Sequence, residues 1–354
     1  MSAKRSAPTR VQPLKVGIIG TGIGRAHFNG YRKCPHVEVA AIVDIDADRG
    51  RQLAQEWGVR RAYSNHEDLL NIKDLDAVSV CTPNALHASI AMDALAAGLH
   101  VICEKPMAAS VEQATELAAA AEQAATRGQL FMMALNNRYR GDTQLLKQYI
   151  DAGDLGDLYL GKCGWWRRQG IPGLGGWFTT KAMSGGGPLI DLGVHALDLC
   201  WWLMGAPDPV AVSASVFDHL GAGEWARRGS PGSFDIEDAA VAHIRFANDA
   251  AIILEVSWIL HTAREGFFCE VMGTAGGGAI EPNFRIVRNL HGAPADVLPA
   301  APKVPGHEGE IIHFVDCVRQ GRQPLSGARD GLAVQKMLDA IYRSGSTGKP
   351  VTIT

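Results

Sequence analysis

The chain has 354 residues, of which 47% are hydrophobic and 20% are charged, and its formal net charge is −3. This length allows two domains with separate cores, and the composition is typical of a globular protein. The near-neutral charge gives no basic field of the kind that attracts nucleic acid or a membrane surface, so we expect neither partner.

Cysteine usage and the first residues both predict a cytoplasmic protein. The seven cysteines are scattered and none forms a C-x-x-C pair, so the sequence indicates neither a metal site nor a disulfide framework. Residues 1–13 are polar and basic, and the apolar run Leu14–Ile19 after them is too short for a signal peptide or a membrane span. We therefore expect a disordered tail over residues 1–13.

Residues 14–135 alternate short strand-like runs with helical patterns. The predicted strands are Lys15–Ile19, Glu38–Val43, Ala77–Cys81, His100–Cys103 and Leu130–Leu135. The predicted helices are Ala47–Trp57, Ala85–Ala97 and Val111–Arg127, the last with Ser110 and Gln113 as a capping box. Alternating strands and helices indicate βαβ units and a doubly wound parallel sheet.

Residues 136–354 follow a different pattern. The predicted helices are Asp142–Ala152, Pro188–Met204, Gly309–Gln320 and Gly331–Arg343. The predicted strands are Leu158–Arg167, Val210–Asp218, Ala239–Phe246, Ala251–Trp258 and Phe267–Gly273. Successive strands joined by turns predict a second α/β domain whose open sheet is mostly antiparallel.

A glycine-rich turn follows the first predicted strand. The segment Gly20–Arg25 opens a helix, where N–H groups and the helix dipole can bind a pyrophosphate. Gly20 permits a tight turn and Gly22 permits close approach of the phosphates. The usual third glycine position holds Arg25, and Gly24 comes one residue early. A tight turn without a ligand would have a similar sequence.

Asp44 ends the second predicted strand. An acid at this position hydrogen-bonds the ribose hydroxyls and repels a 2′-phosphate, so we predict NAD as the cofactor. Asp46 is better suited to cap the next helix. Arg49 would tolerate a phosphate, so NADP is not excluded. A surface aspartate that merely closes the strand is the alternative.

Two tripeptides follow neighbouring predicted strands, Thr82-Pro83-Asn84 and Glu104-Lys105-Pro106. Ligands of a doubly wound sheet bind at the carboxyl ends of its strands, so we expect both tripeptides beside the cofactor. A lysine there can hydrogen-bond a substrate oxygen and stabilise a developing alkoxide. Taken alone, Lys105 is equally consistent with a surface lysine.

The predicted helix Pro188–Met204 is apolar almost all round and carries Asp191, His195 and Asp198 on one stripe. Buried charges are costly unless they are paired or used, so the stripe indicates a site. Asp198 is as well suited to a structural role, through a bond to backbone or to a tryptophan N–H. The glycines at 185–187 would let backbone approach a ligand.

These motifs together resemble the Gfo/Idh/MocA oxidoreductases, over nearly the whole chain. The matching residues are Gly20-Thr21-Gly22, Thr82-Pro83-Asn84 with His87, Glu104-Lys105-Pro106, Asp191 with His195, and the segment Ile312–Asp316. The resemblance implies a Rossmann domain over 14–135, followed by a substrate-binding and oligomerisation domain over 136–354. It also implies a homo-oligomer, a dimer or tetramer, assembled through the open sheet.

The family implies hydride transfer between a nicotinamide and a secondary alcohol or hemiacetal carbon of a sugar, glycoside or inositol. It assigns catalysis to Lys105, Asp191 and His195. The predicted cofactor residues are Gly20, Thr21, Gly22, Ile23, Gly24, Arg25, Asp44, Thr82, Pro83, Asn84, His87, Glu104 and Lys105. The predicted substrate residues are Lys105, Trp166, Arg167, Asp191 and His195, with Asn136, Asn137 and Arg138 as weaker candidates.

His195 is expected to take the hydroxyl proton, Lys105 to donate to the same oxygen, and Asp191 to orient the pair. An unperturbed imidazole titrates near roughly pH 6.5, so oxidation would rise through neutral pH. Asp191 would move this limb upward, and Lys105 and burial would move it downward. Two other functions fit the same fold: a non-catalytic dinucleotide sensor, and a glycoside-processing enzyme that retains NAD.

Overall fold

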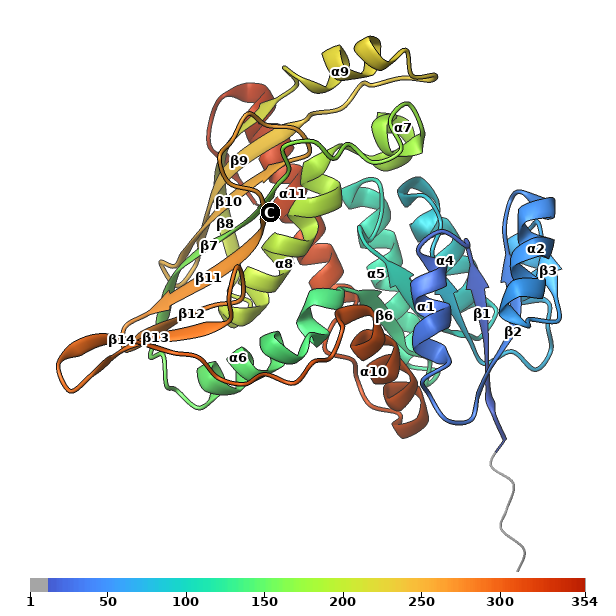
Figure 1. The fold of residues 1–354 in the computed structure, drawn as a ribbon. Helices are drawn as coiled ribbons and strands as arrows, with labels where there is room; N and C mark the ends of the chain where they lie inside the picture. Colours follow the sequence, from blue (N-terminus) through green and yellow to red (C-terminus); the bar gives the residue numbers. More distant parts are fainter. Residues whose placement is uncertain (1–11, 354) are drawn as a thin grey trace, which may run out of the picture.

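The computed structural model describes residues 12–353, which form two sheets with helices between and around them (Figure 1). Most of the predicted disordered tail over 1–13 lies outside the described residues. Among the described residues no helix has the length and apolar character that crossing a membrane requires.

The first sheet has six parallel strands in the order β3-β2-β1-β4-β5-β6, which confirms the doubly wound prediction. Its strands are β1 (Leu14–Ile19), β2 (Val37–Val43), β3 (Ala62–Tyr63), β4 (Ala77–Val80), β5 (His100–Glu104) and β6 (Phe131–Ala134). Its helices are α1 (Gly24–Tyr31), α2 (Ala47–Trp57), α3 (His66–Leu70), α4 (His87–Ala96) and α5 (Val111–Ala125). Short 3₁₀ turns η1 (Asn84–Leu86) and η2 (Asn136–Tyr139) follow β4 and β6.

The second sheet has nine strands in the order β14-β13-β12-β11-β7-β10-β9-β8-β15. Its strands are β7 (Leu158–Trp166), β8 (Pro209–Phe217), β9 (Ala239–Phe246), β10 (Ala251–Ser257), β11 (Gly266–Gly273), β12 (Gly276–Ala279), β13 (Arg285–Leu290), β14 (Ala293–Val297) and β15 (Val351–Thr352). Only the β7–β10 pair is parallel among the described pairs, so the mostly antiparallel prediction is confirmed.

Helices cover one face of this sheet and lie between it and the first sheet (Figure 1). They are α6 (Gly141–Asp151), α8 (Val194–Leu203) and α11 (Ala328–Thr347), with the short elements η3 (Trp177–Thr179), α7 (Lys181–Ser184) and α9 (Gly221–Arg228) at one end. The predicted helix Pro188–Met204 is present, but its first turn, η4 (Leu189–Gly193), is π-helical. Such turns often occur at functional sites.

The last helices return to the first domain. Helix α10 (Gly306–Gln320) packs against α1, and its Ile311, Phe314 and Val315 join a core that contains Ile18 and Phe28. The side chain of Ile311 lies so close to Gly30 of α1 that a Cβ there would come within 2.7 Å of it. A segment more than 150 residues beyond the predicted boundary at 135 thus helps to build the first core.

Candidate active site

A cavity of about 1230 Å³ lies where the carboxyl ends of the parallel strands face the second domain. The predicted site residues that line it are Gly20, Thr21, Gly22, Ile23, Arg25, Asp44, Thr82, Pro83, Asn84, His87, Glu104, Lys105, Arg167, Asp191 and His195. Gly24 and Trp166 do not line it, and neither do the weaker candidates Asn136, Asn137 and Arg138. Residues of both domains therefore line one site, which lies at the carboxyl ends of the parallel strands, where ligands of such sheets bind.

The glycine turn has the form that a dinucleotide needs. Gly20 has φ +95°, and a Cβ there would lie 2.3 Å from the carbonyl oxygen of Cys81. A Cβ on Gly22 would meet nothing within 4 Å, so that side is open to a ligand. Gly24 instead faces Ile18 and allows α1 to pack closely on β1, while Arg25 points outward to Glu56. The displaced third glycine therefore still serves helix–strand packing, and the turn fits a pyrophosphate.

Asp44 is 3% exposed and is held by four donors. The Arg49 guanidinium donates to both carboxylate oxygens at 3.0 and 2.6 Å, Thr21 donates its hydroxyl, and the Asp46 N–H donates at 2.9 Å. Burial alone would raise the pKa of Asp44, but these bonds lower it below its ordinary value. Asp46 caps α2 by accepting the N–H groups of Asp48 and Arg49, as predicted. The carboxylate thus holds in place the arginine that would otherwise be free for a 2′-phosphate.

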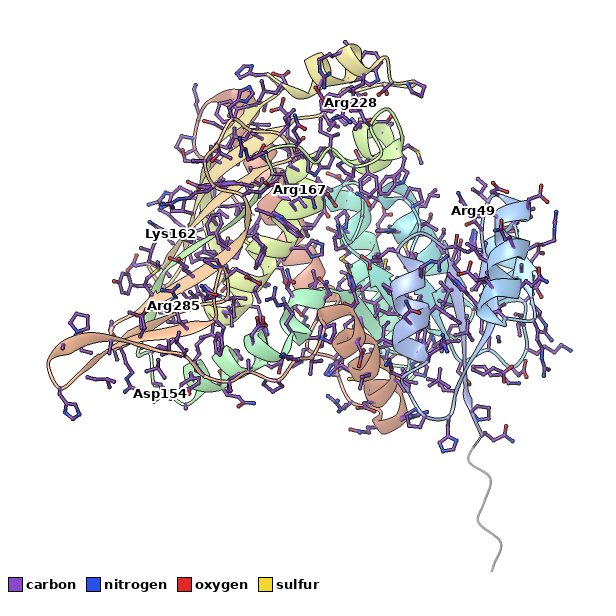
Figure 2. The ribbon with its side chains drawn as sticks, viewed as in Figure 1. Arg49, Asp154, Lys162, Arg167, Arg228 and Arg285 are labelled. Atoms are coloured by element: carbon purple, nitrogen blue, oxygen red, sulfur yellow. The ribbon has the colours of Figure 1, made fainter. Side chains whose placement is uncertain are left out.

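This geometry predicts the effect of Asp44→Ala. The variant loses an acceptor for ribose hydroxyls and releases Arg49 (Figure 2), so the preference for NAD over NADP is expected to narrow by about tenfold or more. Titration calorimetry with both cofactors measures the two dissociation constants. Asp46→Ala is the matched control, because it removes only the cap of α2 and should leave the ratio unchanged. Parent protein that binds NADP as tightly as NAD would contradict the assignment.

Lys105 and Asp191 meet across the domain boundary. The Lys105 Nζ donates to the Asp191 carbonyl at 3.1 Å and to its Oδ1 at 3.2 Å. The Trp258 indole N–H donates to Oδ2 at 3.0 Å, so both carboxylate oxygens are held. Burial would raise the pKa of Asp191, but the charge of Lys105 and the hydrogen bonds from Lys105 and Trp258 lower it. An ionised Asp191 therefore fixes the position of the Lys105 ammonium at the cavity wall.

His195 stands one turn after Asp191 and lines the same cavity. Burial and the nearby Lys105 charge lower the pKa of His195 to about 3, although Asp191 opposes them. Its Nδ1 is buried without a hydrogen-bond partner among the described residues. The ring is therefore neutral throughout the physiological pH range.

Asp198, the third member of the stripe, faces away from the cavity into a structural ion pair. Arg138, fully buried, donates to Asp198 through Nε at 3.1 and 3.0 Å and through Nη2 at 2.5 Å. Its Nη1 reaches Asp330 at 3.0 Å. Asp198 and Arg138 therefore form a buried ion pair, and neither residue lines the cavity.

Asp198→Asn is accordingly expected to lower the free energy of unfolding by about 3–5 kcal/mol, because it leaves the buried Arg138 charge only partly compensated. Denaturant unfolding measures this loss. The folded fraction of the variant should keep the parent KM for its substrate. A loss below about 1 kcal/mol would be typical of an exposed pair and would contradict the structural role.

The strand end of β7 places Trp165 in the cavity and Trp166 outside it. Successive strand residues point to opposite faces, and Trp166 packs against Phe268 at 5.4 Å between ring centroids. Arg167 lines the cavity with its guanidinium 5.0 Å from the Trp165 ring centroid. The predicted substrate residue Trp166 is thus replaced in the cavity wall by its neighbour Trp165.

Several cavity residues were missed from the sequence. Among them are Trp177, Phe178, Met183 and His307. The rings of Trp177 and Phe178 stack with centroids 3.8 Å apart, directly after the glycine-rich segment 170–176, and their aromatic character was a usable signal. Of the weaker candidates, Asn136 contacts His307 at 3.1 Å rather than facing the cavity. His307, on α10, carried no local signal.

Two predicted residues hold loops around the cavity. The Asn84 amide donates to the Ser184 carbonyl at 2.7 Å, linking η1 to α7. The His87 ring nitrogens lie 2.7 and 2.8 Å from the carbonyl oxygens of Pro106 and Thr82. These bonds therefore hold in place the two tripeptides that follow β4 and β5 and border the predicted cofactor region.

Comparison with known proteins agrees with this geometry. Residues 14–132 match the oxidoreductase family with an NAD-binding Rossmann fold, and residues 143–278 match the Gfo/Idh/MocA C-terminal domain. The chain belongs to this family. Its dinucleotide site is therefore an NAD site, and the resemblance found from the motifs is confirmed.

Relatives cover almost the whole chain. D-glucoside 3-dehydrogenase of Escherichia coli (strain K12) is 30% identical, covering 96% of this chain and 98% of the relative. Inositol 2-dehydrogenase of Klebsiella pneumoniae (strain 342) is 27% identical, covering 96% of each chain. A solved levoglucosan dehydrogenase, in complex with NADH and L-sorbose, is 25% identical with a TM-score of 0.86, covering 97% of this chain and 100% of that one.

Proposed function

We propose that this protein is an NAD-dependent dehydrogenase that oxidises a secondary alcohol or hemiacetal carbon of a sugar, glycoside or inositol. The observation that carries the proposal is the contact of Lys105 Nζ with Asp191 Oδ1 at 3.2 Å, in a cavity that also contains the glycine turn and His195. Relatives that act on a glucoside and on inositol support this substrate class.

The roles of the residues follow from their positions. Lys105, held by Asp191, donates to the substrate oxygen and stabilises the alkoxide charge that develops there. His195, neutral, accepts a hydrogen bond from the hydroxyl and is the candidate acceptor of its proton. When bound, NAD supplies the hydride acceptor. Arg167 and the aromatic residues Trp165 and Trp177 line the remaining wall, where a polyhydroxylated ring can stack and hydrogen-bond.

The test is a panel of sugars, glycosides and inositols assayed for NADH absorbance with the purified protein. Net NADH formation with at least one polyol is expected. Bond cleavage of a glycoside without net NADH would show a redox-assisted glycoside-processing enzyme instead. NAD binding without turnover of any member of the panel would favour a dinucleotide sensor.

The open face of the nine-stranded sheet supports a homo-oligomer, a dimer or tetramer. In β9 the buried residues alternate with Val241, His243 and Arg245, which are exposed on the face away from the helices. Tyr159 on β7 is 54% exposed. Light scattering after size-exclusion chromatography measures the assembly. The seven cysteines are all buried free thiols, which supports a reducing compartment such as the cytoplasm.

A further inference from the structure

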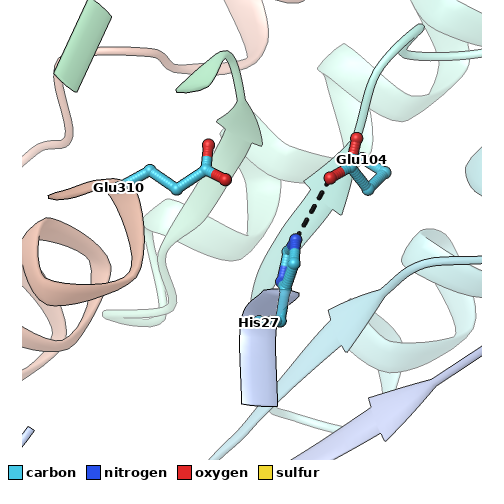
Figure 3. A group of neighbouring side chains, drawn as sticks. All are labelled: His27, Glu104 and Glu310. Carbon is cyan, nitrogen blue, oxygen red and sulfur yellow. Dashed lines mark hydrogen bonds and ion pairs between the residues drawn. The ribbon is translucent and has the colours of Figure 1, made fainter. Parts of the chain in front are cut away.

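Three buried side chains behind Lys105 form a group that the proposed reaction does not use. His27 on α1, Glu104 at the end of β5 and Glu310 on α10 each place one polar atom within 4.8 Å of the others (Figure 3). Their exposed fractions are 0%, 4% and 0%. Figure 3 shows the Glu310 carboxylate pointing toward the other two. Two carboxylates thus face each other in a group whose side chains are almost entirely buried.

Almost every polar atom of this group has a partner. The His27 Nε2 lies 3.1 Å from Glu104 Oε1, and its Nδ1 lies 3.0 Å from the Ser79 hydroxyl. The backbone N–H of Lys105 donates to Glu104 Oε2 at 3.1 Å. Each ring nitrogen of His27 and each oxygen of Glu104 is therefore occupied.

Glu310 differs, because only one of its oxygens is satisfied. The His307 ring places Nδ1 3.0 Å from Glu310 Oε1. Oε2 is buried and has no hydrogen-bond partner among the described residues. A buried carboxylate oxygen without a donor is costly, whereas a protonated carboxyl can itself donate to a neighbouring carboxylate.

The net effect of burial and of the groups around Glu310 is to raise its pKa. The titratable groups that face it come from α1, the residue after β4, β5, η2 and its own helix, and they are His27, Tyr31, Cys81, Glu104, Tyr139 and His307. Burial and the Glu104 charge raise the pKa of Glu310, and they outweigh the His307 hydrogen bond and the His27 and His307 charges, which lower it. Burial would also raise the pKa of Glu104, but the bond from His27 and the charge of Lys105 lower it to about 2. The pKa values of the two carboxyl groups are therefore driven apart, as in other pairs that share one proton.

We propose that Glu310 keeps a proton on Oε2 and donates it toward Glu104, so that the pair presents a single negative charge behind Lys105. Glu310 is then a positioning residue. The proton gives Oε2 of Glu310 a hydrogen bond to donate, so Glu104 stays ionised and accepts the backbone N–H of Lys105. The side chain of Lys105 in turn reaches the substrate. Helix α10 lies near the end of the chain but packs against the first domain, and this packing places Glu310 beside Glu104.

The test compares thermal unfolding of the parent and of Glu310→Gln across pH. A carboxyl whose folded pKa is raised stabilises the fold fully below its unfolded value of about 4.3, and this stabilisation is lost as pH rises through the folded pKa. Glutamine cannot lose a proton and keeps a donor toward Glu104. The Tm of the variant relative to the parent is therefore expected to increase from acid to neutral pH. Glu308→Gln, two residues earlier on α10, should give a pH profile parallel to the parent.

A difference in Tm that stays flat with pH would overturn the proposal, because it would mean that Glu310 titrates alike in the folded and unfolded chains. Carbon-13 NMR of labelled glutamate in the parent protein gives an answer even if the variant does not fold. The assigned Glu310 carboxyl is expected to titrate well above the ordinary glutamate value of about 4.3. A divalent cation retained in stoichiometric amount after dialysis, found by elemental analysis, would instead place a metal between the carboxylates and would also overturn the proposal. None of these measurements depends on turnover, so they are independent of the proposed substrate class.

Discussion

Lys105→Ala is expected to lower the kcat for polyol oxidation by on the order of 10²-fold or more, while NAD still binds. The Lys105 ammonium is held at the cavity wall by the Asp191 carboxylate and carbonyl, at 3.2 and 3.1 Å. Its positive charge is therefore preorganised for the oxygen that gains negative charge during hydride removal. Because this interaction strengthens in the transition state, its loss should appear in kcat more than in KM.

Two measurements separate this result from a general disruption. Calorimetry with NAD should give a dissociation constant close to the parent value, since the glycine turn and Asp44 are untouched. Lys162→Ala is the matched control, because Lys162 lies exposed on β7 and faces away from the cavity (Figure 2). Near-parent turnover by Lys105→Ala would show that another group carries the charge.

The first domain was predictable because its signals are local. Each strand-like run is followed by a turn and a helical pattern, and the glycine turn, Asp44 and the two tripeptides all stand at strand ends. The rule that ligands bind at these ends then brings the residues together without knowledge of the remaining chain. The small elements β3 and α3 and the strands β12 to β15 of the second sheet were missed, because they are short and lack a clear period.

Contacts between segments that are distant in the chain were not predictable. The pairing of Arg138 with Asp198, the indole bond from Trp258 to Asp191, and the arrival of His307 in the cavity all depend on how distant segments pack. The error at Trp166 has a different cause. The two-residue period of a strand already requires neighbouring tryptophans to face opposite ways, but the sequence does not state which of them faces the helices.

The pKa of His195, and with it the pH dependence of oxidation, also depends on how the protein packs. From the sequence, Asp191 and Lys105 push the pKa of the imidazole in opposite directions and the sign stays open. The structure gives burial and the Lys105 charge the larger effect, and they lower the pKa of His195 to about 3. The neutral ring is the competent form for oxidation, so it is already populated at every pH well above that value. The rise through neutral pH expected for an unperturbed histidine should therefore be absent.

His195→Asn is expected to keep NAD binding and to lower kcat for oxidation by on the order of 10²-fold, by about the same factor at each pH between roughly 5 and 8. Asparagine retains polarity and approximate size but cannot accept the proton. The loss should be smaller than for Lys105→Ala, because a ring of such low basicity orients the hydroxyl more than it retains its proton. His291→Asn, at an exposed turn, is the control and should leave the profile unchanged. The contradicting result is an acid limb near pH 6.5 in the parent that disappears in His195→Asn. It would mean that this ring gains its proton at an ordinary pKa. Binding of substrate and NAD would then outweigh the effect of burial on the pKa of His195.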